Sequence, residues 1–359
     1  MTKQYLFLIT ILFGLNSQLF AQQSFNPDQA LEALVSEEGN IGVSAGYSIN
    51  GEIKWSNSEG YACLDDKVPF SVITLTRIAS ISKSMTAVAV MQLAEQNLIN
   101  LDVPIQTYLP DFPNKMEGDI TIRQLLAHTA GIPQYDGEKE IENSIYFPTL
   151  QDAMNVFIDR PLLFKPGTKH FYSTYGYVIL GRIIEEVSGV SFEEYMQTNI
   201  WDVAEMHNTG VELINSEYSN KSCLYYKARR RTRNASQNDL SNRVPGGGFY
   251  STLEDVLKFG DALLQEKLIR QETFQQMLES QPVEYDGNKY GFGWYFYAPA
   301  PNENLVIGHS GTQTGSTSQL MIIPRSNTVV VVLSNTSRTY PEVVTFASGL
   351  IGHSELGKE

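Results

Sequence analysis

Cysteine is scarce in this chain of 359 residues, which has only Cys63 and Cys223. Two cysteines are too few for a cysteine-rich zinc site, although they could pair with each other in an oxidising compartment. The sequence alone does not place them within bonding distance. Histidine is also rare, with five residues, and none has the HExxH or other close spacing that is typical of a metal site. The sequence therefore predicts no bound metal and no other cofactor.

Positive charge is in deficit. The chain has 26 lysines and arginines against 40 acidic residues, which gives a net charge of −14. This balance argues against nucleic acid or an anionic membrane surface as the main partner. One local exception is the run KARRRTR at residues 227–233. A solvated strand edge or loop is favoured there over a basic binding patch.

Long apolar runs are missing after the first residues, so no stable membrane insertion is expected. The N-terminus itself resembles a secretory signal, with Lys3, an apolar segment over residues 5–15 and the small residue Ala21 at a cleavage position. We therefore expect a signal peptide over residues 1–21 and a mature chain that is periplasmic or secreted. The sequence is compatible with a homo-oligomer.

The order of apolar patterns predicts an α/β fold. A helix is expected near residues 27–38, followed by two strands joined at Asn50-Gly51, a strong hairpin signal. Residues from about 80 to 276 are mainly helical in pattern, and strand-like segments return after residue 304. We expect an antiparallel sheet built from both termini, about 22–80 and 290–359, flanked by helices. A large helical part, about 81–289, is inserted between them.

Two serines compete as a nucleophile. Ser44 lies in GVSAG, which fits the G-x-S-x-G elbow of the α/β-hydrolases. That motif requires a strand before the serine and a helix after it, whereas Ser44 lies inside a predicted strand. Ser80 is followed three residues later by Lys83, and at the start of a helix these two side chains share one face. Ser80 is therefore the favoured nucleophile.

Lys83 heads an apolar helical stripe formed by Ala87, Val90, Met91, Ala94 and Leu98. Burial against this stripe would lower the pKa of the amine and make it a usable base. The alternative is structural, with Ser80 as a helix cap and a lysine that extends to solvent. The serine–lysine pair alone does not decide between the two.

Two later segments favour catalysis. Tyr172 follows a Pro-Gly turn and precedes an apolar helix, whereas His309, Ser310 and Gly311 end a predicted strand.

Taken in order, these segments resemble the serine β-lactamase and penicillin-binding protein family, which includes class C β-lactamases, D-Ala-D-Ala carboxypeptidases and related esterases. The family motif S-x-x-K is SISK at residues 80–83, its Y-x-N is YST at 172–174, and its K-T-G or H-x-G is HSG at 309–311. The flanks YSTYGY and GGGFYST are especially similar to those of the mitochondrial serine β-lactamase-like proteins and their bacterial relatives.

The resemblance implies a mechanism and a β-lactamase-like fold. Ser80 would attack a carbonyl, with Lys83 and Tyr172 sharing its proton. The backbone N–H groups of Ser80 and Thr312 would form the oxyanion hole. His309 would line the opposite wall and meet a substrate carboxylate or the tyrosine oxygen.

The remaining substrate contacts implied by the resemblance are Thr174, Ser310 and Gly311. Thr174 replaces the usual asparagine and His309 the usual lysine, and both changes weaken the case for an efficient β-lactamase.

The expected activity is hydrolysis of an amide or ester in a small peptide-like, D-amino-acid-containing or ester substrate. A peptidase for longer peptides, or a β-lactam-binding scaffold with poor turnover, remains an alternative. The sequence does not give the natural substrate.

Overall fold

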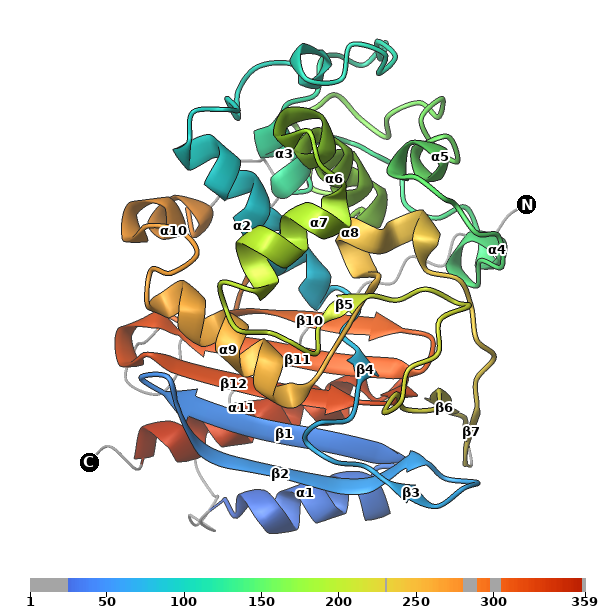
Figure 1. Ribbon diagram of the computed structural model, residues 1–359, viewed down its shortest axis with the longest axis vertical. Helices are drawn as coiled ribbons and strands as arrows, with labels where there is room; N and C mark the ends of the chain where they lie inside the picture. Colours follow the sequence, from blue (N-terminus) through green and yellow to red (C-terminus); the bar gives the residue numbers. More distant parts are fainter. Residues whose placement is uncertain (1–24, 230, 280–288, 298–304, 357–359) are drawn as a thin grey trace.

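A seven-stranded sheet lies at the centre of the protein, with helices on both faces (Figure 1). The computed structural model describes residues 25–229, 231–279, 289–297 and 305–356, so the expected signal segment lies outside the described residues. Neighbouring strands run antiparallel in the order β3-β2-β1-β12-β11-β10-β9. Strands from the two ends of the chain meet where β1 pairs with β12. The expected fold class, an antiparallel sheet built from both termini, is confirmed.

The bounds of the strands are as follows. The large sheet contains β1 (Gly42–Ile49), β2 (Glu52–Cys63), β3 (Val68–Pro69), β9 (Tyr295–Phe296), β10 (Ile307–Gln313), β11 (Ser316–Ile323) and β12 (Thr328–Ser334). One small sheet contains β4 (Thr76–Arg77), β5 (Gly210–Val211) and β8 (Phe249–Ser251), and another contains β6 (Tyr225–Lys227), β7 (Thr232–Asn234) and β13 (Thr336–Ser337).

The helices are α1 (Pro27–Ser36), α2 (Ile81–Glu95), α3 (Ile122–Leu126), α4 (Glu138–Ile141), α5 (Leu150–Met154), α6 (Thr174–Ser188), α7 (Phe192–Met196), α8 (Val244–Gly247), α9 (Leu253–Leu264), α10 (Gln271–Met277) and α11 (Tyr340–Leu356). Helices α1 and α11 cover one face of the large sheet, and α2, α9 and the other helices lie on the opposite side (Figure 1).

Strand β12 shows why the sheet is buried on both faces. Its sequence TVVVVLS is apolar without alternation, which is typical of a strand covered on two sides. Val329, Val331 and Leu333 join the larger apolar core on the α2 side. Val330 and Val332 join the smaller core under α1 and α11. The sheet therefore holds the two helical layers together.

Helix α2 is buried on almost every side, although the sequence pattern suggested one apolar stripe. Residues 81–91 are all buried, including the polar Ser82 and Ser84. The helix ends at Glu95, and Asn97 adopts a left-handed conformation with φ 59°. Leu98, which was expected on the buried stripe, follows that end and is 49% exposed. The apolar stripe is therefore one turn shorter than the sequence indicated.

The two cysteines form a disulfide, Cys63–Cys223, between residues 160 positions apart in sequence. It joins the end of β2 to the segment that leads into β6. The basic run at 227–233 lies at the small β6–β7 pair, where Lys227 makes ion pairs with Glu342 at 2.7 Å and Glu38 at 3.6 Å. The described residues of this run thus lie at the end of β6, in the connecting loop and in the edge strand β7, and Arg231 and Arg233 are exposed, in agreement with the strand edge or loop that the sequence favoured.

Candidate active site

Ser80 stands at the start of α2, immediately after a residue with unusual backbone geometry. Ala79 has φ 47°, a left-handed conformation that a residue with a Cβ adopts only under constraint. The Ser80 side chain makes no capping hydrogen bond to the helix, although the residue occupies the cap position. Lys83 Nζ lies 3.2 Å from Ser80 Oγ. The structure therefore disagrees with the simple capping role, and the hydroxyl is directed to the lysine.

Lys83 is fully buried, with 0% of its surface exposed. Its Nζ donates to Gly246 O at 2.5 Å and lies 3.2 Å from Thr174 Oγ1. Burial lowers the pKa of Lys83 well below 10.5, and the charge of Arg243 lowers it further. Within the described ranges no ion pair involves Lys83, so the low pKa is not offset by a carboxylate. Burial therefore favours the neutral form of this amine, in contrast to a lysine that extends to solvent.

Tyr172 lies over the same amine, with Lys83 Nζ 4.8 Å from the centre of its ring. Burial raises the pKa of the Tyr172 phenol well above 10, whereas its hydrogen bond with Ser80 acts in the opposite direction. The phenol is consequently protonated at neutral pH. The structure thus brings Ser80, Lys83 and Tyr172 together as the sequence motifs suggested.

His128 holds the segment that carries Tyr172. The backbone N–H of Ser173 donates to His128 Nδ1 at 3.2 Å, and that of Phe171 donates to His128 O at 2.9 Å. The rings of His128 and Tyr172 are 4.3 Å apart. Both neighbours of Tyr172 are therefore held by one residue, His128.

Thr174 is buried beside Lys83 and forms two hydrogen bonds with Gln134. Gln134 Nε2 donates to Thr174 Oγ1 at 3.1 Å, and the Thr174 N–H donates to Gln134 Oε1 at 2.9 Å. Gly246 packs beside it, since a Cβ at that position would lie 2.6 Å from Thr174 Cγ2. Sequence reasoning missed Gln134 and the Gly246 carbonyl, because a single glutamine and a glycine carbonyl have no distinguishing pattern.

Strand β10 borders the site from the sheet side. A Cβ at Gly311 would lie 2.4 Å from Ile78 O, so only glycine allows the strand to come this close to the segment that ends in Ser80. Ser310 is half-buried and Thr312 exposed on the same strand. The contact at Gly311 therefore brings the part of β10 that carries Thr312 against the start of α2.

His309 lies on β10 and is 1% exposed. Its Nδ1 is 2.7 Å from Ser310 O, and because a carbonyl only accepts, Nδ1 is the donor. Its Nε2 is 3.0 Å from the hydroxyl of Tyr290. Burial, followed by the charge of Lys83, lowers the pKa of His309 to about 3, so the ring is neutral and Nε2 accepts from Tyr290. Both ring nitrogens therefore have hydrogen-bond partners, and the tyrosine that bonds to His309 is Tyr290 rather than Tyr172.

Ser44, the competing nucleophile, is buried within β1 and pairs in register with Ser58 and Leu333 of the neighbouring strands. A side chain enclosed by the sheet is not accessible to a substrate.

Two general features bear on cofactors and membranes. In the ranges that the structure describes, no three histidine, cysteine, aspartate or glutamate side chains are arranged to hold a metal ion. No described helix is both long enough and apolar enough to cross a bilayer.

Comparison with known proteins identifies the class of this fold and site. The Beta-lactamase family profile matches residues 27–346. The chain belongs to this family and is a β-lactamase-like serine hydrolase. Among curated proteins it is 29% identical to the human serine beta-lactamase-like protein LACTB, mitochondrial, over 86% of this chain and 73% of that protein.

Solved structures support the same assignment. A penicillin-binding protein from Bacillus halodurans superposes with a TM-score of 0.78 at 27% identity, covering 90% of this chain and 99% of that one. A D-amino acid amidase from Ochrobactrum anthropi SV3 gives a TM-score of 0.81 at 21% identity, covering 92% and 100%. At that identity the amidase shows a shared fold alone. The resemblance that the sequence motifs suggested is therefore confirmed at the level of family and fold.

Proposed function

We propose that the protein hydrolyses its substrate through an acyl-enzyme on Ser80, with Lys83 as the base. The observation that carries this proposal is the buried Lys83 amine at 3.2 Å from Ser80 Oγ, whose pKa is lowered by burial so that its neutral form is favoured. A neutral amine has two N–H groups and one lone pair. Gly246 O and Thr174 Oγ1 accept the two N–H groups, which directs the lone pair to the Ser80 hydroxyl.

The steps follow from these positions. Ser80 Oγ bonds to the substrate carbonyl carbon as its proton passes to Lys83, and the carbonyl oxygen becomes an oxyanion between the N–H groups of Ser80 and Thr312. When the intermediate collapses, the bond to the leaving amine or alcohol breaks. The leaving group takes the proton from Lys83 through the protonated phenol of Tyr172. Water then attacks the acyl ester by the reverse sequence, which releases the acid and restores Ser80.

The substrate we propose is a small amide or ester without a carboxylate on the leaving-group side. His309 occupies the motif position where a lysine would hold a carboxylate, but it is neutral and both of its nitrogens have partners. Ser310 and Gly311 would then line the strand along which the acyl group lies. A D-amino-acid amide is a suitable first compound, since a D-amino acid amidase shares the fold.

The main rival substrates are β-lactams and longer peptides. Both a penicillin and a C-terminal D-alanine carry a carboxylate, which the neutral His309 does not attract. A scaffold with poor turnover is disfavoured, because Ser80, Lys83 and Tyr172 remain assembled. These rivals differ in which substrates they hydrolyse, and a panel separates them.

We propose further that the mature protein is periplasmic or secreted. The signal-like residues 1–21 and the Cys63–Cys223 disulfide both support this location, since disulfides persist mainly in oxidising compartments.

A labelling experiment tests the nucleophile. A fluorophosphonate probe should label the wild-type protein and the Ser44→Ala variant, but not Ser80→Ala, and peptide mass spectrometry should locate the adduct on Ser80. A substrate panel of D-phenylalanine amide, p-nitrophenyl acetate, D-alanyl-D-alanine and a chromogenic cephalosporin follows. We expect turnover of the first two compounds. Labelling that persists in Ser80→Ala contradicts the mechanism, and preferred hydrolysis of the last two contradicts the substrate class.

A further inference from the structure

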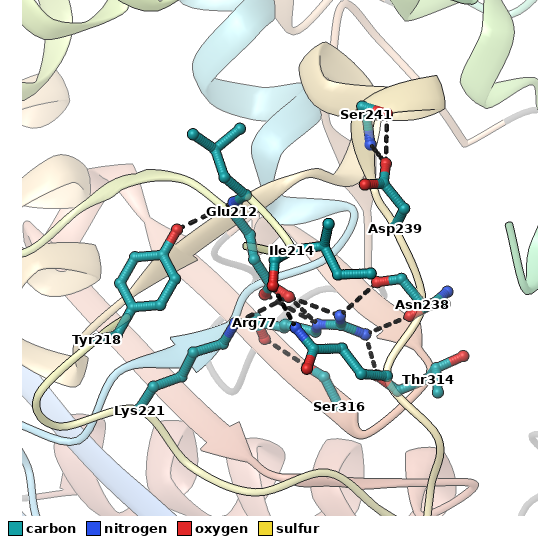
Figure 2. A network of polar contacts seen from close by, with 12 residues as sticks. Arg77, Glu212, Ile214, Tyr218, Lys221, Asn238, Asp239, Ser241, Thr314 and Ser316 are labelled. Carbon is teal, nitrogen blue, oxygen red and sulfur yellow. Dashed lines mark hydrogen bonds and ion pairs between the residues drawn. The ribbon is translucent and has the colours of Figure 1, made fainter. Parts of the chain in front are cut away.

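Arg77 lies three residues before Ser80, on β4, and its side chain is buried with 0% exposure. Its Nε contacts both carboxylate oxygens of Glu212, at 3.0 and 2.9 Å, and its Nη2 donates to Glu212 Oε1 at 2.6 Å. Glu212 is 1% exposed. Burial raises the pKa of Glu212, but the charges of Arg77 and Lys221 outweigh it, so the net pKa is lowered and the carboxylate is ionised. Figure 2 shows this buried pair at the centre of a polar network.

The remaining donors of Arg77 bind two other segments of the chain (Figure 2). Nη1 donates to Thr314 O at 2.9 Å and to Asn238 Oδ1 at 2.7 Å, and Nη2 donates to Asn238 O at 3.1 Å. Since arginine has five N–H donors in a fixed planar fork, all of them are used here. Thr314 lies in the turn between β10 and β11, two residues after Thr312. The arginine therefore joins the approach to Ser80 to the turn beyond Thr312.

Side chains of β11 strengthen the same connection. Ser316 Oγ donates to Arg77 O, and Ser318 Oγ donates to Ile78 O at 2.8 Å. Gly311 approaches Ile78 O so closely that no Cβ fits between them. The chain before Ser80 and the β10–β11 hairpin thus contact each other at several points. Of these, the Arg77 guanidinium is the contact that reaches the turn itself.

We infer that Arg77 is a positioning residue, which fixes the backbone N–H of Thr312 relative to that of Ser80 and so sets the geometry of the oxyanion hole. This inference rests on the proposed function, since it assigns those two N–H groups to the oxyanion. A displacement of about 1 Å in such a site can reduce the rate about a hundredfold. Replacing Arg77 should therefore weaken binding of the transition state more than binding of the substrate.

Arg77→Lys tests the inference while it keeps the positive charge. A lysine has three donors and no planar fork, so it cannot bind Glu212, Asn238 and Thr314 together. We expect kcat for p-nitrophenyl acetate to fall about 10- to 100-fold, with KM within about threefold. The inhibition constant of a phenylboronic acid should rise by a similar factor as kcat falls, because the boronate adduct on Ser80 places an oxygen between the two N–H groups.

Lys221→Met is the matched control. Lys221 Nζ pairs with Glu212 Oε1 at 2.9 Å, at the edge of the network, and the substitution leaves the contact between Arg77 and Thr314 intact. Its kcat and boronate affinity should remain within about twofold of wild type. A large loss of kcat or boronate affinity in this control would mean that activity depends on the charge balance of the network rather than on the position of the turn. That result would overturn the inference.

A triple variant covers the case in which Arg77→Lys does not fold. Arg77→Met, Glu212→Met and Lys221→Met together remove all three charges, and such apolar replacement of a buried ionic group is often tolerated. We expect this variant to fold but to lose kcat and boronate affinity by the same order as Arg77→Lys. If a folded variant, Arg77→Lys or the triple, binds the boronate as wild type does, Arg77 has only a structural role. If the boronate does not bind wild-type protein, the proposed function fails instead.

Discussion

Replacing Lys83 by methionine should remove activity without weakening the fold at neutral pH. Methionine has a similar length to the aliphatic part of lysine and carries no amine to desolvate, so the cost of burying that group disappears. The hydrogen bond to Gly246 O is lost, which offsets part of this gain. Acylation should fall by on the order of a hundredfold or more, because general-base catalysis is worth at least that amount.

The pH dependence of stability gives a sharper test of the buried amine. The folded pKa of Lys83 lies well below its unfolded value of 10.5, because burial disfavours the charged form. Between those two values the unfolded chain binds a proton that the folded chain does not. The free energy of unfolding of the wild type should therefore rise with pH, by up to about 1.4 kcal/mol per pH unit, relative to Lys83→Met. Below the folded pKa and above 10.5 the difference should be constant.

The assay is urea unfolding of both proteins across the alkaline range, together with hydrolysis of p-nitrophenyl acetate. Lys115→Met is a matched control, since Lys115 also donates to two backbone carbonyls, those of Ile158 and Arg160, on the helical side. This control should retain its activity. A Lys83→Met variant that keeps more than about a third of wild-type activity would refute the role of the lysine as base. An unfolding difference that is flat with pH would refute its neutral state.

Three further perturbations follow from contacts in and near the site. Tyr172→Phe should retain stability but lose about tenfold or more in turnover of amides, measured against D-phenylalanine amide, because the leaving amine needs the phenol proton; unchanged turnover would contradict that role. Gly311→Ala should reduce esterase activity by about tenfold or more, since its Cβ would lie 2.4 Å from Ile78 O, and wild-type kinetics would show that β10 can shift freely. The Cys63→Ser and Cys223→Ser double variant should lose up to about 5 kcal/mol in urea unfolding, because the disulfide closes a loop of 160 residues, and an unchanged midpoint would contradict this estimate.

The sequence predicted those parts of the site that depend on local spacing. Ser80 and Lys83 are three residues apart, and a helix brings such a pair to one face wherever it lies in the fold. The hairpin at Asn50-Gly51 and the alternating or apolar runs of the strands are equally local, so the sheet from both termini was predictable. The family motifs then ordered these local signals along the chain, which identified Tyr172 and residues 309–311 as neighbours.

Long-range partners were not predictable, because nothing in the local sequence distinguishes them. Tyr290, which occupies His309 Nε2, is one of 19 tyrosines. Arg77 finds its partners Glu212 and Thr314 135 and 237 positions away. The acceptor of the shortest Lys83 hydrogen bond is a backbone carbonyl, which every residue carries. Such contacts depend on how distant segments pack, and only the folded chain specifies them.

Four titratable rings around Lys83 are uncharged, which helps to explain how a lysine can be buried and still serve as a base. Burial lowers the pKa of His128 and His309, and it raises the pKa of Tyr172 and Tyr177, so all four groups are neutral near pH 7. A carboxylate in their place would hold Lys83 in its charged form and remove the lone pair that Ser80 needs. Because burial disfavours the charged amine and no carboxylate among the described residues forms an ion pair with it, the pKa of Lys83 is lowered. The aromatic residues around Lys83 therefore contribute to its role as a base, because they bury the amine without supplying a negative charge.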